Sequence, residues 1–228
     1  MMPKCTGVAA LSLSAMLVAG PLFAQGFEGE VAYKMMSEKG KTTEMVMALK
    51  GAKMRTDANT EGHAMTMLMD GQTQVMKMLM PEQKMYMSMD LKSMREHMQR
   101  KKRTPPKVTP LGTKETIAGR TCENFVIETE DSKMEFCNIK GIGNFLAPRN
   151  PMGRGSSDGL SELDDEVYRS YFKDGFFPLR LTDLEGGKRR VIMEATRVEP
   201  KSFDASYFEV PAGFSEMKMP GMMGPPRQ

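Results

Sequence analysis

The sequence predicts a mainly β protein of the α+β class, and three observations lead to this prediction. Methionine occupies every second position in three neighbouring stretches, which is the period of a strand with one apolar face. Short turn signals separate these stretches, and two cysteines flank a further pair of strand-like runs. The 228 residues include 26 Met and no Trp, and 27% of them are charged. This length and composition suit one folded domain with room for a hydrophobic core.

The N-terminal segment has the features of an export signal. Lys4 is the only charged residue before Glu28, and an apolar run extends from residue 8 to residue 18. Ala24 supplies a small residue for cleavage before Gln25. The run is shorter than the roughly 20 apolar residues of a membrane-spanning helix. We therefore expect a cleaved signal peptide at residues 1–24 and a periplasmic protein, with a retained anchor as the alternative.

The rest of the chain is expected to form a single domain at residues 25–214, followed by a tail. Val31 and Tyr33 share one parity, as do Met45 and Met47 before the turn-like sequence at 50–53. Together with the methionine stretches, this alternation predicts about five antiparallel strands in the first part of the domain. Residues 215–228 are rich in Met, Pro and Gly and are expected to be disordered.

Three triplets of alternating methionines form the strongest pattern in the sequence. Asp70-Gly71, a two-residue hairpin signal, separates the first triplet from the second, and a four-residue turn at 81–84 separates the second from the third. These turn lengths would place Met65 opposite Met76 and Met76 opposite Met89, with every triplet on one side of a three-stranded meander. The other side is more polar, so the methionine side is expected to face the core or a concavity. The nine residues are Met65, Met67, Met69, Met76, Met78, Met80, Met85, Met87 and Met89.

Two helices are expected between the strands. Asp90 can cap a helix over 91–103, which the sequence Thr104-Pro105-Pro106 would end. The basic residues at 100–103 suit a solvated helix end, and transient contact with anionic membrane lipid is the alternative. Ser161 begins an S-x-x-D sequence that predicts a second helix to about Phe172.

Two cysteines remain once the signal peptide is removed, and further strands are expected around them at 113–117, 179–181 and 190–198. Cys122 and Cys137 flank two strand-like runs joined near residues 128–131. Directly opposed cysteines on neighbouring strands can form a disulfide, and the pair lacks the C-x-x-C spacing of redox-active thiols. We therefore expect a structural bridge in an oxidising compartment, with Cys122 opposite Cys137, worth about 3 kcal/mol.

Three short motifs carry a resemblance to a known family. They are TIAGRTCENF at 116–125, FPLR at 177–180 and FEVPAGF at 208–214. This chain resembles the DUF4412 family of unknown function, which is similar to periplasmic lipoprotein carriers of the LolA type. The resemblance implies a curved antiparallel, incompletely closed half-barrel with a helical lid. It also implies a concavity of the kind in which such carriers hold acyl chains.

Nine thioethers on one face allow several functions. Methionine fills irregular cores, and it also lines grooves that accept ligands of varied shape. The pattern is therefore consistent with a packed core and with an apolar ligand cavity. An exposed methionine surface could instead consume oxidants by forming sulfoxide. Our leading hypothesis is an exported protein that binds an apolar or lipid-like ligand in a concavity lined by the nine methionines, with transient contact to membrane lipid or to an envelope protein.

Binding of the soft metals Cu(I) or Ag(I) is a further alternative, because thioethers select soft cations. Sulfurs two residues apart on one strand are about 7 Å apart, so a trio drawn from neighbouring strands, such as Met65, Met76 and Met89, is the better geometry. The candidate metal ligands are His63, Met65, Met76, Met89, Met217, Met219, Met222 and Met223.

Enzymatic and nucleic-acid functions are not favoured. The 32 basic and 29 acidic residues give a net charge of only +3, too weak for a nucleic-acid surface. G-x-S-x-G, H-E-x-x-H and phosphate-binding glycine motifs are absent from the sequence. We therefore expect a protein without catalytic residues and without a cofactor.

Overall fold

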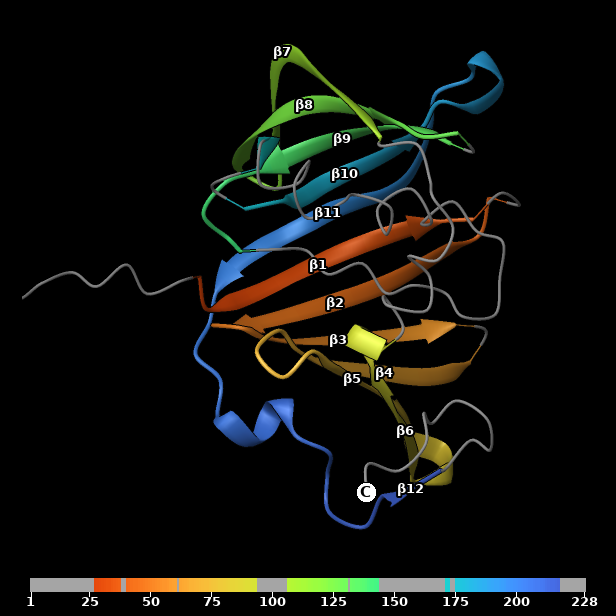
Figure 1. The fold of residues 1–228 in the computed structure, drawn as a ribbon, viewed down its shortest axis with the longest axis vertical. Helices are drawn as coiled ribbons and strands as arrows, with labels where there is room; N and C mark the ends of the chain where they lie inside the picture. The colour runs from red at the N-terminus through yellow and green to blue at the C-terminus, as the bar shows by residue number, and fades with distance from the viewer. Residues whose placement is uncertain are drawn as a thin grey trace, which may run out of the picture.

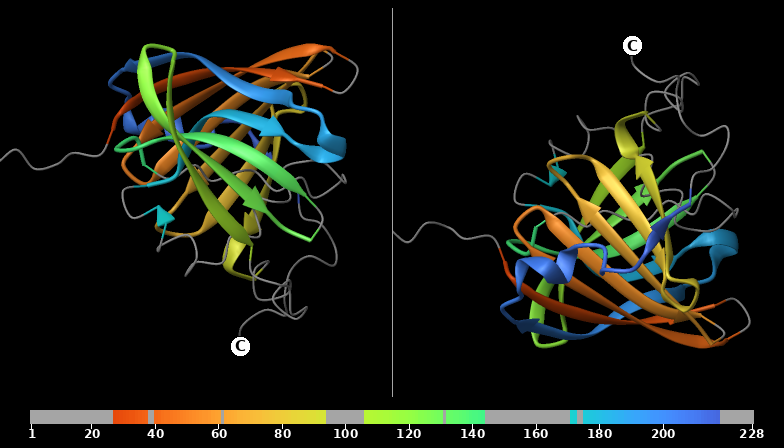
Figure 2. Two further views of the ribbon diagram at one scale, coloured as in Figure 1. Left: turned by 90° about the horizontal axis from the view of Figure 1, so that it is seen from above. Right: turned by 90° about the horizontal axis from the view of Figure 1, so that it is seen from below.

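The fold is one strongly curved sheet that does not close (Figures 1 and 2). The computed structural model describes residues 27–37, 40–60, 62–93, 106–130, 132–143, 171–172 and 175–217. In this part of the chain, the sheet has twelve strands in the order β12-β6-β5-β4-β3-β2-β1-β11-β10-β9-β8-β7. The strands are β1 Gly29–Met36, β2 Thr42–Lys50, β3 Lys53–Thr60, β4 His63–Asp70, β5 Val75–Met80, β6 Met85–Asp90, β7 Lys107–Ile117, β8 Arg120–Glu128, β9 Lys133–Ile139, β10 Phe177–Asp183, β11 Arg190–Pro200 and β12 Ser215–Glu216.

Two meanders make up the sheet, and β1 and β11 join them. Strands β1 to β6 follow one another in space as they do in the sequence, and so do β7 to β11. All neighbours are antiparallel except β12, which pairs in parallel with β6 at one edge. Among the described residues, three short 3₁₀ helices interrupt the connections: η1 Pro81–Gln83, η2 Glu185–Gly187 and η3 Ala205–Phe208. The predicted mainly β fold with an incompletely closed sheet is thus confirmed.

The predicted signal peptide at residues 1–24 lies outside the described residues, and so does most of the predicted helical lid. The helix expected from Leu91 is helical over 91–93, and the Asp90 carboxylate accepts hydrogen bonds from the N–H groups of Lys92 and Ser93, at 2.8 and 3.1 Å. This is the predicted N-cap. The helix expected over 161–172 falls outside the described residues except for its last two positions.

The main hydrophobic core lies on the inner face of the curved sheet. One continuous row of opposed residues crosses from β1 to β8 on this face: Met35, Met193, Leu181, Phe136 and Phe125. The buried methionines of β2 to β5 belong to the same core cluster as these aromatic residues. The sheet curves around this core (Figure 2), and the buried methionines of one meander and the phenylalanines of the other belong to one cluster.

Candidate functional site

The nine predicted methionines lie on one face of β4, β5 and β6, which we call the methionine face. Opposed residues in a sheet share a face, and the registers align Met69, Met76 and Met89 in one row and Met67, Met78 and Met87 in the next. A third row contains Met80 and Met85. The four-residue turn at 81–84 has the predicted register, with Lys84 at φ 52° after η1.

The predicted pairing of Met65 with Met76 is wrong, because the turn after β4 begins one residue later and is two residues longer than expected. Met69 lies opposite Met76, so residues 71–74 form a four-residue turn. The Asp70 carboxylate accepts hydrogen bonds from the N–H groups of Gln72 and Thr73, at 2.8 and 3.1 Å, and this stabilises the longer turn. Two added residues change the row partners but keep the parity, so all nine methionines stay on one face.

The face extends onto β2, where the sequence predicts alternating residues but no site, and onto β3. Met54 lies opposite Met69, and Met47 lies opposite Thr56, which in turn lies opposite Met67. Burial falls from this side towards the sheet edge. Met47, Met54 and Met76 are 0%, 3% and 1% exposed, respectively. By contrast, Met78, Met80, Met85, Met87 and Met89 are half-buried, and Met65 is 42% exposed.

A hydroxyl group interrupts the methionine face. Thr56 is 5% exposed. Of the buried side-chain oxygen and nitrogen atoms in the described residues, its Oγ1 is the one without a hydrogen-bond partner. It lies in one row with Met47 and Met67. A buried hydroxyl without a partner costs about 1–3 kcal/mol, so this group destabilises the free protein within an otherwise apolar face.

Replacing Thr56 with valine tests whether the hydroxyl is unpaired in the free protein. Thr56→Val should raise the free energy of unfolding by about 1 kcal/mol, because a methyl group of similar shape needs no partner. Urea unfolding monitored by circular dichroism measures the difference. As a control, Thr66→Val should destabilise the protein, since the Thr66 hydroxyl donates to Asp57 Oδ1 at 2.6 Å. A loss of stability in Thr56→Val would mean that its hydroxyl is satisfied.

The opposite face of β2 and β3 is covered by the C-terminal segment, which the sequence did not predict. Phe203 and Phe208 pack against Ala48 of β2. The Arg55 guanidinium of β3 lies 4.4 Å from the centre of the Tyr207 ring and donates a hydrogen bond to the Tyr207 carbonyl at 3.1 Å. Beyond η3 the chain reaches the free edge of β6, where β12 pairs with it. The segment therefore occupies the outer face, while the methionine face is on the inner side.

The residues of the soft-metal hypothesis are only partly brought together. Met65 is four residues, about 13 Å along β4, from Met69, the residue that faces Met76, so the expected trio of Met65, Met76 and Met89 does not form. His63 Nδ1 lies 3.2 Å from Glu82 Oε2 of η1. Met217 donates its backbone N–H to the Tyr86 carbonyl at 2.7 Å. Met219, Met222 and Met223 lie outside the described residues.

Other site types find little support in the described part of the chain. It contains no group of three or more His, Cys, Asp or Glu side chains that could hold a metal ion. An open pocket over the ends of β2, β3 and β4 is lined by Glu44, Asp57 and Met65, among others. The Asp57 carboxylate is already engaged by the Arg55 guanidinium at 2.7 Å and by the Thr66 hydroxyl. None of the helices in these residues has the length and apolar character needed to cross a membrane.

The predicted disulfide between Cys122 and Cys137 is present, with 5.3 Å between the Cα atoms. The two cysteines are 1% and 2% exposed. The predicted direct opposition is wrong: Asn124 lies opposite Cys137, so the bridge runs diagonally between β8 and β9. The turn after β8 is responsible, because the Ser132 N–H donates to Thr129 Oγ1 at 3.0 Å and closes a turn one residue later than expected.

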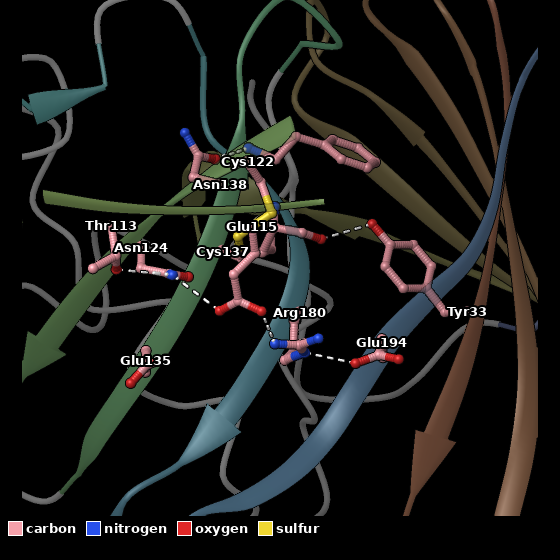
Figure 3. The surroundings of a disulfide bond; sticks show 12 residues. Tyr33, Thr113, Glu115, Cys122, Asn124, Glu135, Cys137, Asn138, Arg180 and Glu194 are labelled. Carbon is pink, nitrogen blue, oxygen red and sulfur yellow. Dashed lines mark hydrogen bonds and ion pairs between the residues drawn. A yellow bond between two sulfur atoms is a disulfide. The ribbon is translucent and has the colours of Figure 1, made fainter. Parts of the chain in front are cut away.

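Ion pairs surround the disulfide on the outer face of the sheet (Figure 3). The Arg180 guanidinium donates to Glu115 at 2.5 Å and to Glu194 at 2.6 Å, which links β7, β10 and β11. Asn124 donates to the other Glu115 oxygen at 3.0 Å. The hydrogen bond from Arg180 lowers the pKa of the Glu115 carboxyl, so this carboxyl is ionised at neutral pH. Arg180, Glu115 and Glu194 are therefore all paired, and their interactions hold β7, β10 and β11 together.

Solved structures with a similar fold include an uncharacterised conserved protein from Thermus thermophilus. The TM-score is 0.52 at 8% identity, over 85% of this chain and 91% of that chain. PNGF-II gives 0.46 at 11% identity over 83% of this chain and 30% of that chain, and MucB gives 0.39 at 13% identity over 83% and 59%. The first similarity extends to the fold alone, and the two weaker ones support no conclusion.

The comparison with curated proteins gives no match. The match to the family described as "Domain of unknown function (DUF4412)" covers residues 27–214, which include all twelve strands except the last and the whole methionine face. The chain therefore belongs to the DUF4412 family.

Proposed function

We propose that this chain is an exported, non-enzymatic protein that binds an apolar or lipid-like ligand on its methionine face. The observation that carries the proposal is the gradient of burial across that face. Met47, Met54 and Met76 are buried and form a floor, whereas Met80, Met85 and Met87 are half-buried at the edge of the curved sheet. Flexible, polarisable thioethers at half-exposed positions suit contact with acyl chains of varied shape.

The buried disulfide supports export, because such bridges form and persist in oxidising compartments. The oxidant-scavenging hypothesis stays a prediction. Met65, at 42% exposed, is the position of the methionine face most open to oxidants.

Binding of cis-parinaric acid, a fluorescent fatty acid, tests the proposal. The double variant Met78→Gln/Met87→Gln should weaken binding at least tenfold, because two opposed amides would have to be desolvated without partners. Fluorescence titration of the oxidised protein measures the dissociation constant. Native mass spectrometry of protein purified from its own envelope should also show a bound lipid.

The matched control uses the neighbouring row on the other face of the same strands. Lys77 lies opposite Ser88, so Lys77→Gln/Ser88→Gln changes β5 and β6 without touching the methionine face. This variant should bind the fatty acid within twofold of the parent chain. Equal affinity in both double variants, together with protein that emerges from its envelope free of lipid, would contradict the proposed function.

A further inference from the structure

The least buried part of the methionine face contains a corner where three strands bring thioethers into one row. Met80 and Met85 are opposed on β5 and β6, and both are half-buried. The β4–β5 register pairs Thr66 with Leu79, and one further step sets Met65 opposite Met80. Met65 is 42% exposed. We call Met65, Met80 and Met85 the rim row.

An imidazole lies at the same corner and is held by a carboxylate. His63 is two residues before Met65 on β4 and therefore shares its face. Its Nδ1 is 3.2 Å from Oε2 of Glu82, which lies in the turn between Met80 and Met85. In the neutral tautomer with the proton on Nδ1, this nitrogen donates to the Glu82 oxygen and the lone pair of Nε2 is available. Metal-binding histidines have this arrangement, with the second ring nitrogen donating to a carboxylate.

We propose that the rim row and His63 Nε2 bind one soft monovalent cation, Cu(I) or Ag(I). Thioethers and imidazole are ligands that Cu(I) accepts, and neutral ligands beside the Glu82 carboxylate suit a single positive charge. Opposed Cβ atoms are about 5 Å apart, and the flexible methionine side chains can then converge on one ion. The methionines of the inner rows are not free to converge on an ion, since Met69 and Met76 are 4% and 1% exposed and pack in the core.

The site is separate from the proposed ligand function in both occupant and chemistry. An acyl chain needs apolar surface and makes no use of an imidazole. A soft cation needs donor atoms such as thioether sulfur and imidazole nitrogen. His63→Ala should therefore retain binding of cis-parinaric acid while losing affinity for Cu(I), so failure of one proposal leaves the other standing.

Anaerobic titration of Cu(I) against bicinchoninate, in the full chain with the disulfide intact, tests the site. Met80→Leu/Met85→Leu should weaken Cu(I) binding at least tenfold relative to the parent chain. His63→Ala and Glu82→Gln should each weaken it about tenfold, the latter through loss of the partner that orients the ring. Any Cu(I) bound elsewhere on the chain is common to all variants.

The matched control removes the same number of thioethers from the same strands. Met78 and Met89 are half-buried and pack against the main core, and Met78→Leu/Met89→Leu should leave Cu(I) affinity within twofold of the parent. Methyl NMR of labelled methionines, with Ag(I) as the probe, should shift Met65, Met80 and Met85 before any other residue of the face. A loss below threefold in Met80→Leu/Met85→Leu, or an equal loss in the control, overturns the proposal.

Discussion

Met47→Ala and Met76→Ala are each expected to lower the free energy of unfolding by about 3 kcal/mol. Both side chains are fully buried on the inner face, at 0% and 1% exposure. Truncating a buried methionine removes the transfer free energy of the lost atoms and leaves a cavity that the neighbours fill only in part. Urea unfolding at fixed pH, with the slope of the transition checked for constancy, measures the loss.

Half-buried positions on the same face provide the control for this experiment. Met80→Ala and Met85→Ala remove the same atoms, but both side chains are half-exposed, so each should cost about 1 kcal/mol or less. Met47→Leu, which nearly conserves volume, should cost below about 1.5 kcal/mol. A uniform loss at all four positions would show that the face is packed throughout, and the proposed ligand surface would then disappear.

The gradient from Met47 to Met85 also shows why packing and binding could not be separated from sequence. Period two places residues on a face, and this prediction depends only on neighbours along the strand. Burial depends on what covers the face. The buried methionines share one core cluster with Phe125 and Phe136, which are more than thirty residues away from Met89 in the chain. Alternation contains no information about such contacts.

The error in the predicted register came from a wrongly predicted turn. Asp70-Gly71 is typical of a two-residue hairpin, yet the Asp70 carboxylate binds the N–H groups of the next residues and extends the turn to four. The methionine face was still predicted correctly, because adding two residues preserves parity. Row partners did change, and with them the trio expected to bind metal. A prediction of a face is therefore more robust than a prediction of which residues touch.

Two features of the site had no usable signal in the sequence. Thr56 is a single threonine in an alternating strand, and nothing local indicates that its hydroxyl lies between Met47 and Met67 without a partner. The cover formed by Phe203 and Tyr207 also escaped prediction. The sequence contains these aromatic residues, but the residues of β2 and β3 that they contact lie about 150 positions earlier in the chain. The hydrogen bond from Arg55 to Tyr207 is one such contact.

Removing the disulfide with Cys122→Ala/Cys137→Ala is expected to lower the free energy of unfolding by about 3 kcal/mol. The bridge closes a loop with a sequence separation of 15, and in the chain-entropy model a loop of this size restricts the unfolded chain by that amount. Two buried sulfur atoms are also lost beneath the Arg180 network, since both cysteines are nearly inaccessible. Chemical unfolding with and without dithiothreitol measures the effect.

The reductant separates the bridge from the packing of its sulfur atoms. Dithiothreitol should destabilise the parent chain by somewhat less than the double substitution does, because the sulfur atoms stay in place, and it should leave the double variant unchanged, because nothing remains to be reduced. If the parent chain lost less than about 1 kcal/mol on reduction, the β8–β9 hairpin would have to persist in the unfolded state, held by its own turn at 129–132. In that case the ion pairs of Arg180 with Glu115 and Glu194 would fix this half of the sheet, and the bridge would be dispensable for the fold.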